Sequence, residues 1–160
     1  MSIRYVIGGG CIVLGYVGGC IYSSKMKSRY NTAKNIYDGL KILRSEIITY
    51  GRGLSSGLEK ACTITQCEAL NEILRTITCN SNYNDVIDTF DIDAISKDAL
   101  KNLLLKIRYS SLDDIAAAFD DCIKTVSLCV QNAFNTYKKE AVLYKRLGIL
   151  TGIAVFILLC

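Results

Sequence analysis

The sequence predicts an all-α protein, an antiparallel helical bundle with N-terminal and C-terminal transmembrane helices. There is no Pro among the 160 residues, and apolar side chains recur every three or four positions through the middle. Both ends are apolar, at residues 3–22 and 147–160. We therefore expect a transmembrane helix over 1–24, a helical bundle over 25–146 and a second transmembrane helix over 147–160.

The two apolar ends differ in length. Residues 3–22 contain a single charged side chain, Arg4, and as a helix they would extend about 30 Å, which matches the core of a bilayer. Residues 147–160 would extend only about 21 Å. The second segment therefore spans only if the polar side chains before it reach up to the interface or the bilayer thins.

Basic residues flank both apolar ends on the side facing the middle of the chain. They are Lys25, Lys27, Arg29 and Lys34 after the first segment, and Lys138, Lys139, Lys145 and Arg146 before the second. Such clusters hold the intervening stretch in the cytoplasm, so the middle domain is expected there, between two spans. Residues 17–20 also look like a lipoprotein box, with a lipid on Cys20 and an outward domain, but the basic residues behind them oppose translocation.

Glycines recur at four-residue spacing in both apolar ends. The pairs are Gly15 with Gly19 and Gly148 with Gly152. Small residues at this spacing let membrane helices pack closely, so these glycines are candidates for transmembrane helix packing. The alternative is that small residues are simply common in membrane helices.

The first part of the middle domain predicts three helices. A stripe of apolar side chains recurs from residue 30 to residue 50, and Gly51 and Gly53 then end the first helix. Ser55 or Ser56 can cap a second helix. A third is predicted by Leu70, Ile73, Leu74 and Ile77.

The second part of the middle domain follows a polar loop at residues 79–84. A short helix around Ile87 and a longer one capped by Ser96 come next. Ser111 and Asp114 form a capping box that opens the last helix. Because no Gly or Pro follows before Gly148, that helix should run on into the membrane without a joint.

Charge is distributed unevenly along the domain. Residues 61–121 hold 11 Asp or Glu and 5 Lys or Arg, whereas the flanking stretches are basic. Basic ends match anionic membrane lipids. The acidic part argues against nucleic acid as a partner and favours a basic protein, although solvated helix faces and caps would give the same composition.

No pattern for catalysis or metal binding is present. The chain has no His, and its 8 Cys show no C-x-x-C spacing, so they are expected to be small buried hydrophobes. Residues 51–57 contain three glycines but lack the Lys of a phosphate-binding loop. We predict that the protein is not an enzyme and uses no cofactor or metal.

Three stretches resemble the family of stage III sporulation protein AB. Residues 40–51 read LKILRSEIITYG, residues 143–152 read LYKRLGILTG, and the chain ends in an Ile-Leu-Leu run. The length and the order of segments fit the same family. The resemblance covers most of the chain and contains no catalytic motif.

The resemblance implies a role in endospore formation. Such proteins lie in the mother-cell engulfing membrane around the forespore, as part of a secretion-like channel complex that connects the two cells. Their cytoplasmic domain is similar to that of the inner-membrane platform protein of type II secretion. The expected partners are a cytoplasmic secretion-type ATPase and other stage III channel proteins.

From both lines we expect a platform, and the candidate partner-binding residues are Arg44, Glu46, Asp113, Asp114, Asp120 and Asp121. The alternative function is a bitopic or lipid-anchored envelope protein with an outward helical binding domain. Self-association of the chain is left open.

Overall fold

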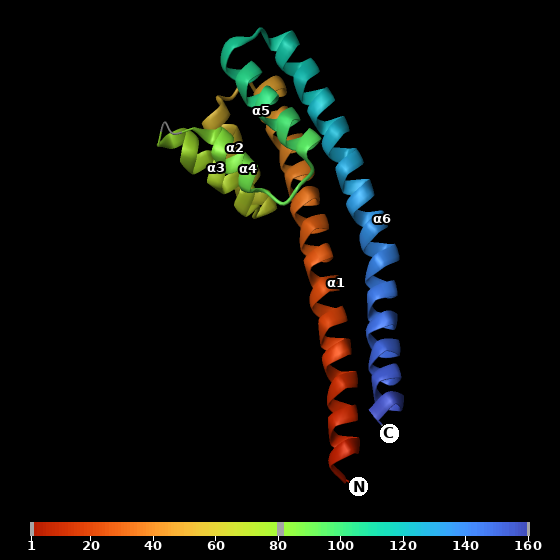
Figure 1. Ribbon diagram of the computed structural model, residues 1–160. Coiled ribbons are helices and arrows are strands. Elements are labelled where there is room, and N and C mark those ends of the chain that lie inside the picture. Colours follow the sequence, from red (N-terminus) through yellow and green to blue (C-terminus); the bar gives the residue numbers. More distant parts are fainter. Residues whose placement is uncertain (1, 80–81, 160) are drawn as a thin grey trace. The chain divides into compact units, whose positions relative to one another are not determined.

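A computed structural model describes the backbone of residues 2–79 and 82–159; side chains at 1–15, 141–142, 145, 148, 152, 155–156 and 158–160 lie outside the description. Every element among these residues is helical, which confirms the all-α prediction there (Figure 1). The elements are α1 (Ser2–Arg44), the π-helical turn η1 (Ser45–Thr49), α2 (Leu54–Thr65), α3 (Glu68–Thr78), α4 (Tyr83–Thr89), α5 (Ala94–Tyr109) and α6 (Leu112–Leu159).

The chain divides into two units, and α1 and α6 contribute to both. One unit contains residues 1–30 and 133–160. In it, the rings of Tyr22 and Tyr144 lie 4.2 Å apart and those of Tyr30 and Phe134 lie 5.4 Å apart between centroids. The later residue of α1 therefore contacts the earlier residue of α6, so the two helices are antiparallel in this unit.

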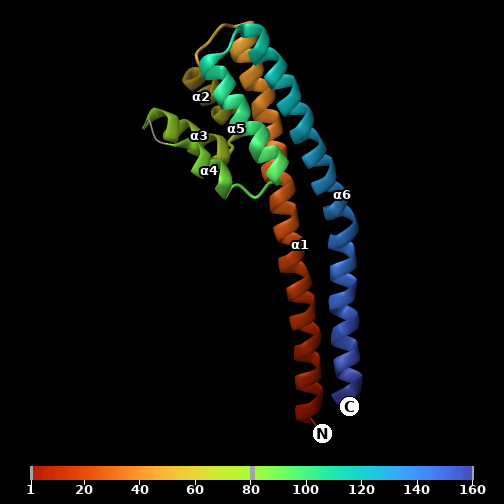
Figure 2. The ribbon, with the colours of Figure 1, turned by 45° about the horizontal axis from the view of Figure 1, so that its top comes forward.

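The other unit, residues 31–132, is the helical bundle. The predicted stripe of α1 is buried in its core at Ala33, Ile36, Leu40 and Leu43. Consecutive short helices contact one another, α2 with α3, α3 with α4 and α4 with α5. In the views of Figures 1 and 2, this part of α1 runs between α6 and α2–α4. The α1 stripe is therefore buried because helices cover it on both sides.

The predicted helix caps are right at one end and wrong at two. Ser111 accepts from the Asp114 amide at 3.4 Å, which confirms it as the cap of α6, but the Asp114 carboxylate accepts from the Ser111 hydroxyl at 2.7 Å, which is not the backbone bond that completes a capping box. α2 already begins at Leu54, so neither predicted serine caps it. α5 begins after Asp93, and Ser96 is buried inside its first turn. Both helices begin about one turn before the predicted serines, at Leu54 and Ala94. Several neighbouring positions can precede a helix, so the serines alone did not define its start.

The predicted loop at residues 79–84 is shorter in the described residues. The Asn82 side chain accepts a hydrogen bond from the Asn84 amide at 3.2 Å, and α4 begins at Tyr83. Residues 80 and 81 lie outside the description. The polar residues of this stretch thus act partly as a helix cap, as Asn does elsewhere.

The turn after η1 requires a glycine at one of its two glycine positions. Gly51 has φ +64°, which is in the left-handed region, whereas Gly53 has φ −65° and meets no atom within 4 Å where a Cβ would stand. We expect Gly51→Ser to lower the free energy of unfolding by about 1 kcal/mol. The matched change Gly53→Ser should be neutral or stabilising, because Ser favours the position before a helix. Thermal unfolding of both variants checks this, and equal losses would contradict it.

The terminal spans predicted at 1–24 and 147–160 are not supported by the described residues. Among those residues, no helix has a stretch that is both long and apolar enough to cross a bilayer.

Candidate partner-binding surface

Glu46 is a charged residue in the core of the bundle. Its side chain is 4% exposed, and its carboxylate lies 2.6 Å from the Lys60 ammonium and 3.0 Å from the Arg52 guanidinium. The two cations are 43% and 49% exposed. One buried carboxylate therefore holds two cations that also reach solvent, which leaves the group with one net positive charge.

The sequence after α1 brings these three residues together. The widened turn η1 follows Arg44, and the Arg52 amide donates to the Glu46 carbonyl at 3.0 Å, which folds the chain back. α2 then packs closely, because Gly57 has no side chain. A Cβ there would lie 2.9 Å from Leu43 Cδ1 and 3.5 Å from Glu46 Cβ. Glu46 thus connects η1, the turn and α2.

Arg44 and Asp120, two of the predicted residues, pair with each other. The guanidinium faces the carboxylate with Nε–Oδ1 at 3.0 Å and Nη2–Oδ2 at 3.3 Å. The pair joins α1 to α6 within the bundle. Because the side chains are 38% and 63% exposed, the pair contributes at most about 1 kcal/mol to stability.

The remaining predicted aspartates differ in their surroundings. Asp114 is hydrogen-bonded to Ser111, the cap of α6, through both its amide and its carboxylate. Asp113 and Asp121 are exposed. They lie eight residues apart on one helix, which places them about 80° apart around its axis. Of the four predicted aspartates, these two are therefore the ones best placed to meet a partner.

Arg52 and Lys60 were missed by sequence reasoning. Arg52 lies in the turn between two glycines, and Lys60 lies on a different helix from Glu46. No spacing rule relates a carboxylate at the end of one helix to a lysine on the next. The one local signal was the charge of Arg52 inside a turn of glycines.

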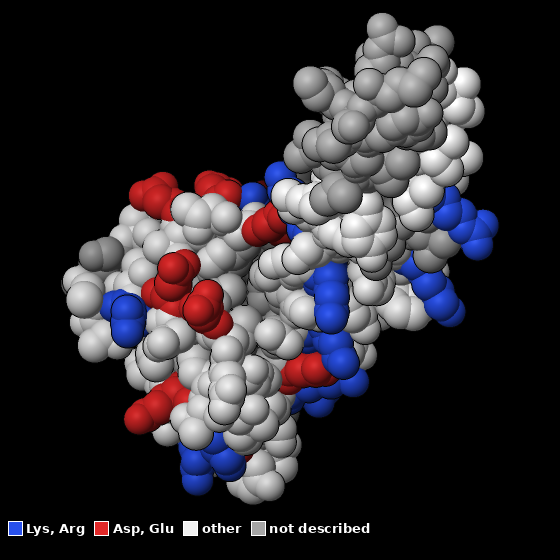
Figure 3. All heavy atoms as spheres, turned by 90° about the horizontal axis from the view of Figure 1, so that it is seen from below, with Lys and Arg blue, Asp and Glu red and all other residues white. Residues whose placement is uncertain are grey.

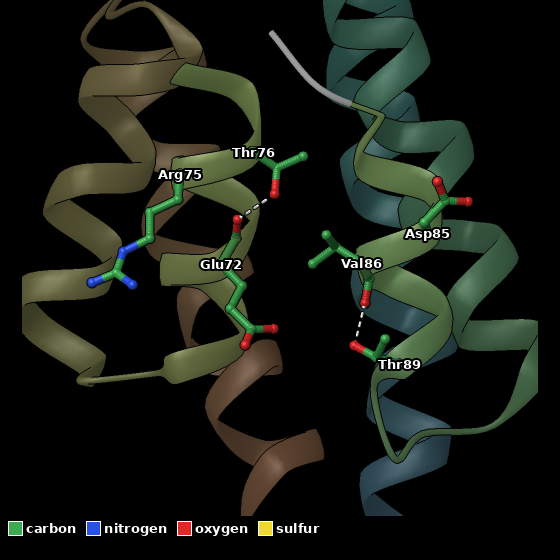
Figure 4. Close-up of a pocket in the computed structure, with 6 residues that line it drawn as sticks. All are labelled: Glu72, Arg75, Thr76, Asp85, Val86 and Thr89. Atoms are coloured by element: carbon green, nitrogen blue, oxygen red, sulfur yellow. Dashed lines mark hydrogen bonds between the residues drawn. The ribbon is translucent and has the colours of Figure 1, made fainter. Parts of the chain in front are cut away.

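A groove runs between α3 and α4. It has a volume of about 490 Å³ and is lined by Glu72, Arg75 and Thr76 of α3 and by Asp85, Val86 and Thr89 of α4 (Figure 4). Figure 4 shows the Glu72 carboxylate in the space between the helices, whereas Arg75 and Asp85 point away from it. Thr76 and Thr89 donate to carbonyls of their own helices. The groove therefore presents carboxylate to solvent.

A second hollow, of about 410 Å³, shares Glu72 and Thr89 with this groove and adds Glu68. Figure 3 shows Asp and Glu side chains gathered over the left part of the visible face, where the short helices lie in Figure 1. Residues 31–132 carry 14 Asp or Glu and 11 Lys or Arg, whereas residues 1–30 and 133–160 carry 1 and 8. The bundle is thus the acidic part of the chain.

The cysteines of the bundle were expected to be buried, and Cys79 is exposed instead, whereas Cys67 and Cys122 are buried. Burial raises the pKa of Cys122 to about 12 and raises the pKa of Cys62 and Cys67. Burial also raises the pKa of Cys129, beside Asp93. Thiols with raised pKa values are weak nucleophiles at neutral pH. Within the part of the chain that the structure describes, no group of three or more His, Cys, Asp or Glu could hold a metal ion.

The predicted glycine pairs fall mostly outside the description. Gly19 is buried on α1. The surroundings of Gly15, Gly148 and Gly152 lie outside the described residues. Their proposed part in helix packing stays a prediction.

A family model for stage III sporulation protein AB matches residues 5–160. The chain belongs to this family. No curated protein and no solved structure matched it.

Membership of the stage III sporulation protein AB family confirms the resemblance seen in residues 40–51 and 143–152. It makes the chain a sporulation protein. The stage III sporulation protein AB family is not a known family of enzymes.

Proposed function

We propose that the chain is a non-enzymatic platform of the secretion-like channel complex between mother cell and forespore, anchored in the engulfing membrane and docking a cytoplasmic secretion-type ATPase. The observation that carries this proposal is the helix pair. α1 has 43 residues and α6 has 48, and neither is interrupted between the acidic bundle and the basic, apolar ends of the chain. Both long helices thus contribute to the bundle and to the apolar ends, as an anchored scaffold requires.

Membrane anchoring is supported by the sequence of the ends. Residues 3–22 and 147–160 are apolar, and each is flanked by Lys or Arg on the side of the bundle. A reporter inserted at residues 79–84 tests the orientation. Green fluorescence without alkaline phosphatase activity is the expected result. Phosphatase activity at this site would favour the alternative, an envelope protein whose helical domain faces outward.

Docking of the ATPase is supported by the acidic surface of the bundle. Asp113 and Asp121 are exposed, and Glu72 faces the groove between α3 and α4. Each of these acidic sites would attract a basic partner and repel an acidic one. The other stage III channel proteins would then meet the chain at or within the membrane.

We expect Asp113→Lys with Asp121→Lys to weaken capture of the ATPase by about tenfold or more, because charge reversal turns attraction into repulsion. Capture by the full chain in nanodiscs is the measurement. The matched control is Glu59→Lys with Asp98→Lys, which changes the net charge equally at other exposed positions. Unchanged capture by the first variant, or an equal loss in the control, would remove these aspartates from the interface.

A further inference from the structure

An apolar pocket lies in the bundle, apart from the acidic groove. Its volume is about 420 Å³, and η1 and all five α-helices of the bundle beyond α1 contribute to its wall. The apolar residues of the wall, two from α5 and one from each of the other elements, are Ile47, Leu54, Ile77, Tyr83, Leu104, Ile107 and Ile115. Pockets of this size and composition are typical of binding sites in proteins.

The charged residues that line this pocket are both arginines. Arg52 and Arg108 contribute to the wall, and no Asp or Glu among the described residues does. Arg52 shares Glu46 with Lys60, so that group keeps a net positive charge. The Arg108 guanidinium lies 5.7 Å from the ring centroid of Tyr109. The pocket wall is thus basic, opposite in sign to the exposed Asp113 and Asp121 of α6 and to Glu72 of α3.

Exposed apolar side chains adjoin the pocket in the sequence. Tyr50 is 64% exposed, Tyr109 is 75% exposed and Leu112 is 65% exposed. Tyr50 lies at the end of η1, beside the turn that carries Arg52, whereas Tyr109 ends α5 directly after Arg108 and Leu112 begins α6. Both places are at the same end of the bundle in Figures 1 and 2. Tyr and Arg around a desolvated pocket are the residue types that dominate binding at protein interfaces.

We propose that this pocket binds a segment of a partner protein that presents a large apolar side chain next to Asp or Glu. The apolar side chain would enter the pocket, and the carboxylates would meet Arg108 and Arg52 as charge-assisted pairs. The exposed Tyr50, Tyr109 and Leu112 would cover the flanks of the segment. Charge complementarity identifies the occupant, since a basic segment would be repelled by the same arginines.

This inference does not depend on docking of the ATPase to the acidic surface. The two surfaces attract opposite charges and can be altered by different variants. The platform would hold two partners at once, or two parts of one partner, through separate contacts.

A designed peptide tests the proposal directly. The chain contains no Trp, so the fluorescence of a peptide Trp reports binding without interference. The full chain in zwitterionic nanodiscs is titrated with the blocked peptide EELWEE and with its counterpart KKLWKK. We expect a blue-shifted, saturable signal with the acidic peptide, and binding at least about tenfold weaker with the basic one.

Variants locate the binding site. Arg108→Glu should weaken binding of EELWEE by about tenfold or more, whereas Lys106→Glu, on the same helix but outside the pocket wall, should leave it unchanged. Gly53→Phe should also weaken binding, because Gly53 lines the pocket and has free space where its Cβ would stand.

Three results would overturn the proposal. The first is equal binding of the two peptides, and the second is equal loss in Arg108→Glu and Lys106→Glu. The third is a wild-type chain that binds neither peptide but self-associates in light scattering, with Arg108→Glu abolishing that association. The pocket would then be an interface between copies of the chain.

Discussion

Replacing Arg52 and Lys60 together by Met is expected to lower the free energy of unfolding of the bundle by about 3–5 kcal/mol. The Glu46 side chain is 4% exposed and holds both cations at 3.0 Å or less. Without them, a carboxylate would stay buried with no opposite charge, and this is the costly state for an ion in a protein interior. Thermal unfolding of the full chain in nanodiscs, followed by circular dichroism, is the measurement.

Removing the carboxylate instead of the two cations should lower the free energy of unfolding by less. Glu46→Gln leaves Arg52 and Lys60 without their carboxylate, but both are nearly half exposed and can turn to water. We expect a loss of about 1.5–3 kcal/mol, the range for a hydrogen bond to a charged group. The control for the double variant is Lys106→Met with Lys124→Met, two exposed lysines whose loss changes the net charge equally. A loss in the control as large as in the double variant would show that net charge, and not Glu46, is responsible.

Phe119→Ala should lower the free energy of unfolding as much as the double replacement of Arg52 and Lys60, but for a different physical reason. Phe119 is 0% exposed in the core of the bundle. Truncating a buried Phe removes its transfer free energy and leaves a cavity, with a typical loss of about 3–5 kcal/mol. Its neighbour Asp120 pairs with Arg44, so the loss of packing falls where α6 is joined to α1.

The same substitution elsewhere on α6 is the control. Phe134 is 39% exposed and packs on the ring of Tyr30 in the other unit. Phe134→Ala should cost about 1 kcal/mol, the order of one aromatic pair. Thermal unfolding compares the two variants. Similar losses would contradict the assignment of Phe119, and not Phe134, to the bundle core.

The helices of the bundle were predictable because each has a local cause. Ala33, Ile36, Leu40 and Leu43 repeat at the spacing of a helix face, and all four are buried. The end of the helix at Gly51 was predictable too, because glycine readily adopts the left-handed backbone conformation that this position has. Local patterns of this kind fix the helices and many of their ends.

The site was less predictable because its contacts join distant residues. The Glu46 group includes Lys60 on another helix, and Arg44 meets a residue 76 positions away. Charge alone marked Arg44 and Asp120 as candidates for a partner, whereas the fold pairs them with each other. The caps predicted at Ser55 or Ser56 and at Ser96 were wrong because the first residue of a helix is poorly defined by local sequence. Several neighbouring positions can precede the helix, and here Gly53 and Asp93 do so.

The order of synthesis gives the pairing of α1 with α6 a further consequence. The α1 stripe is completed by Phe119 and Val126, both fully buried in the same core. These residues are made roughly 80 positions after the stripe they cover, so a nascent chain must carry an unfinished apolar face until they emerge from the ribosome. The bundle can therefore close only after Phe119 and Val126 have left the ribosome, so completion of its fold comes late in the synthesis of residues 31–132.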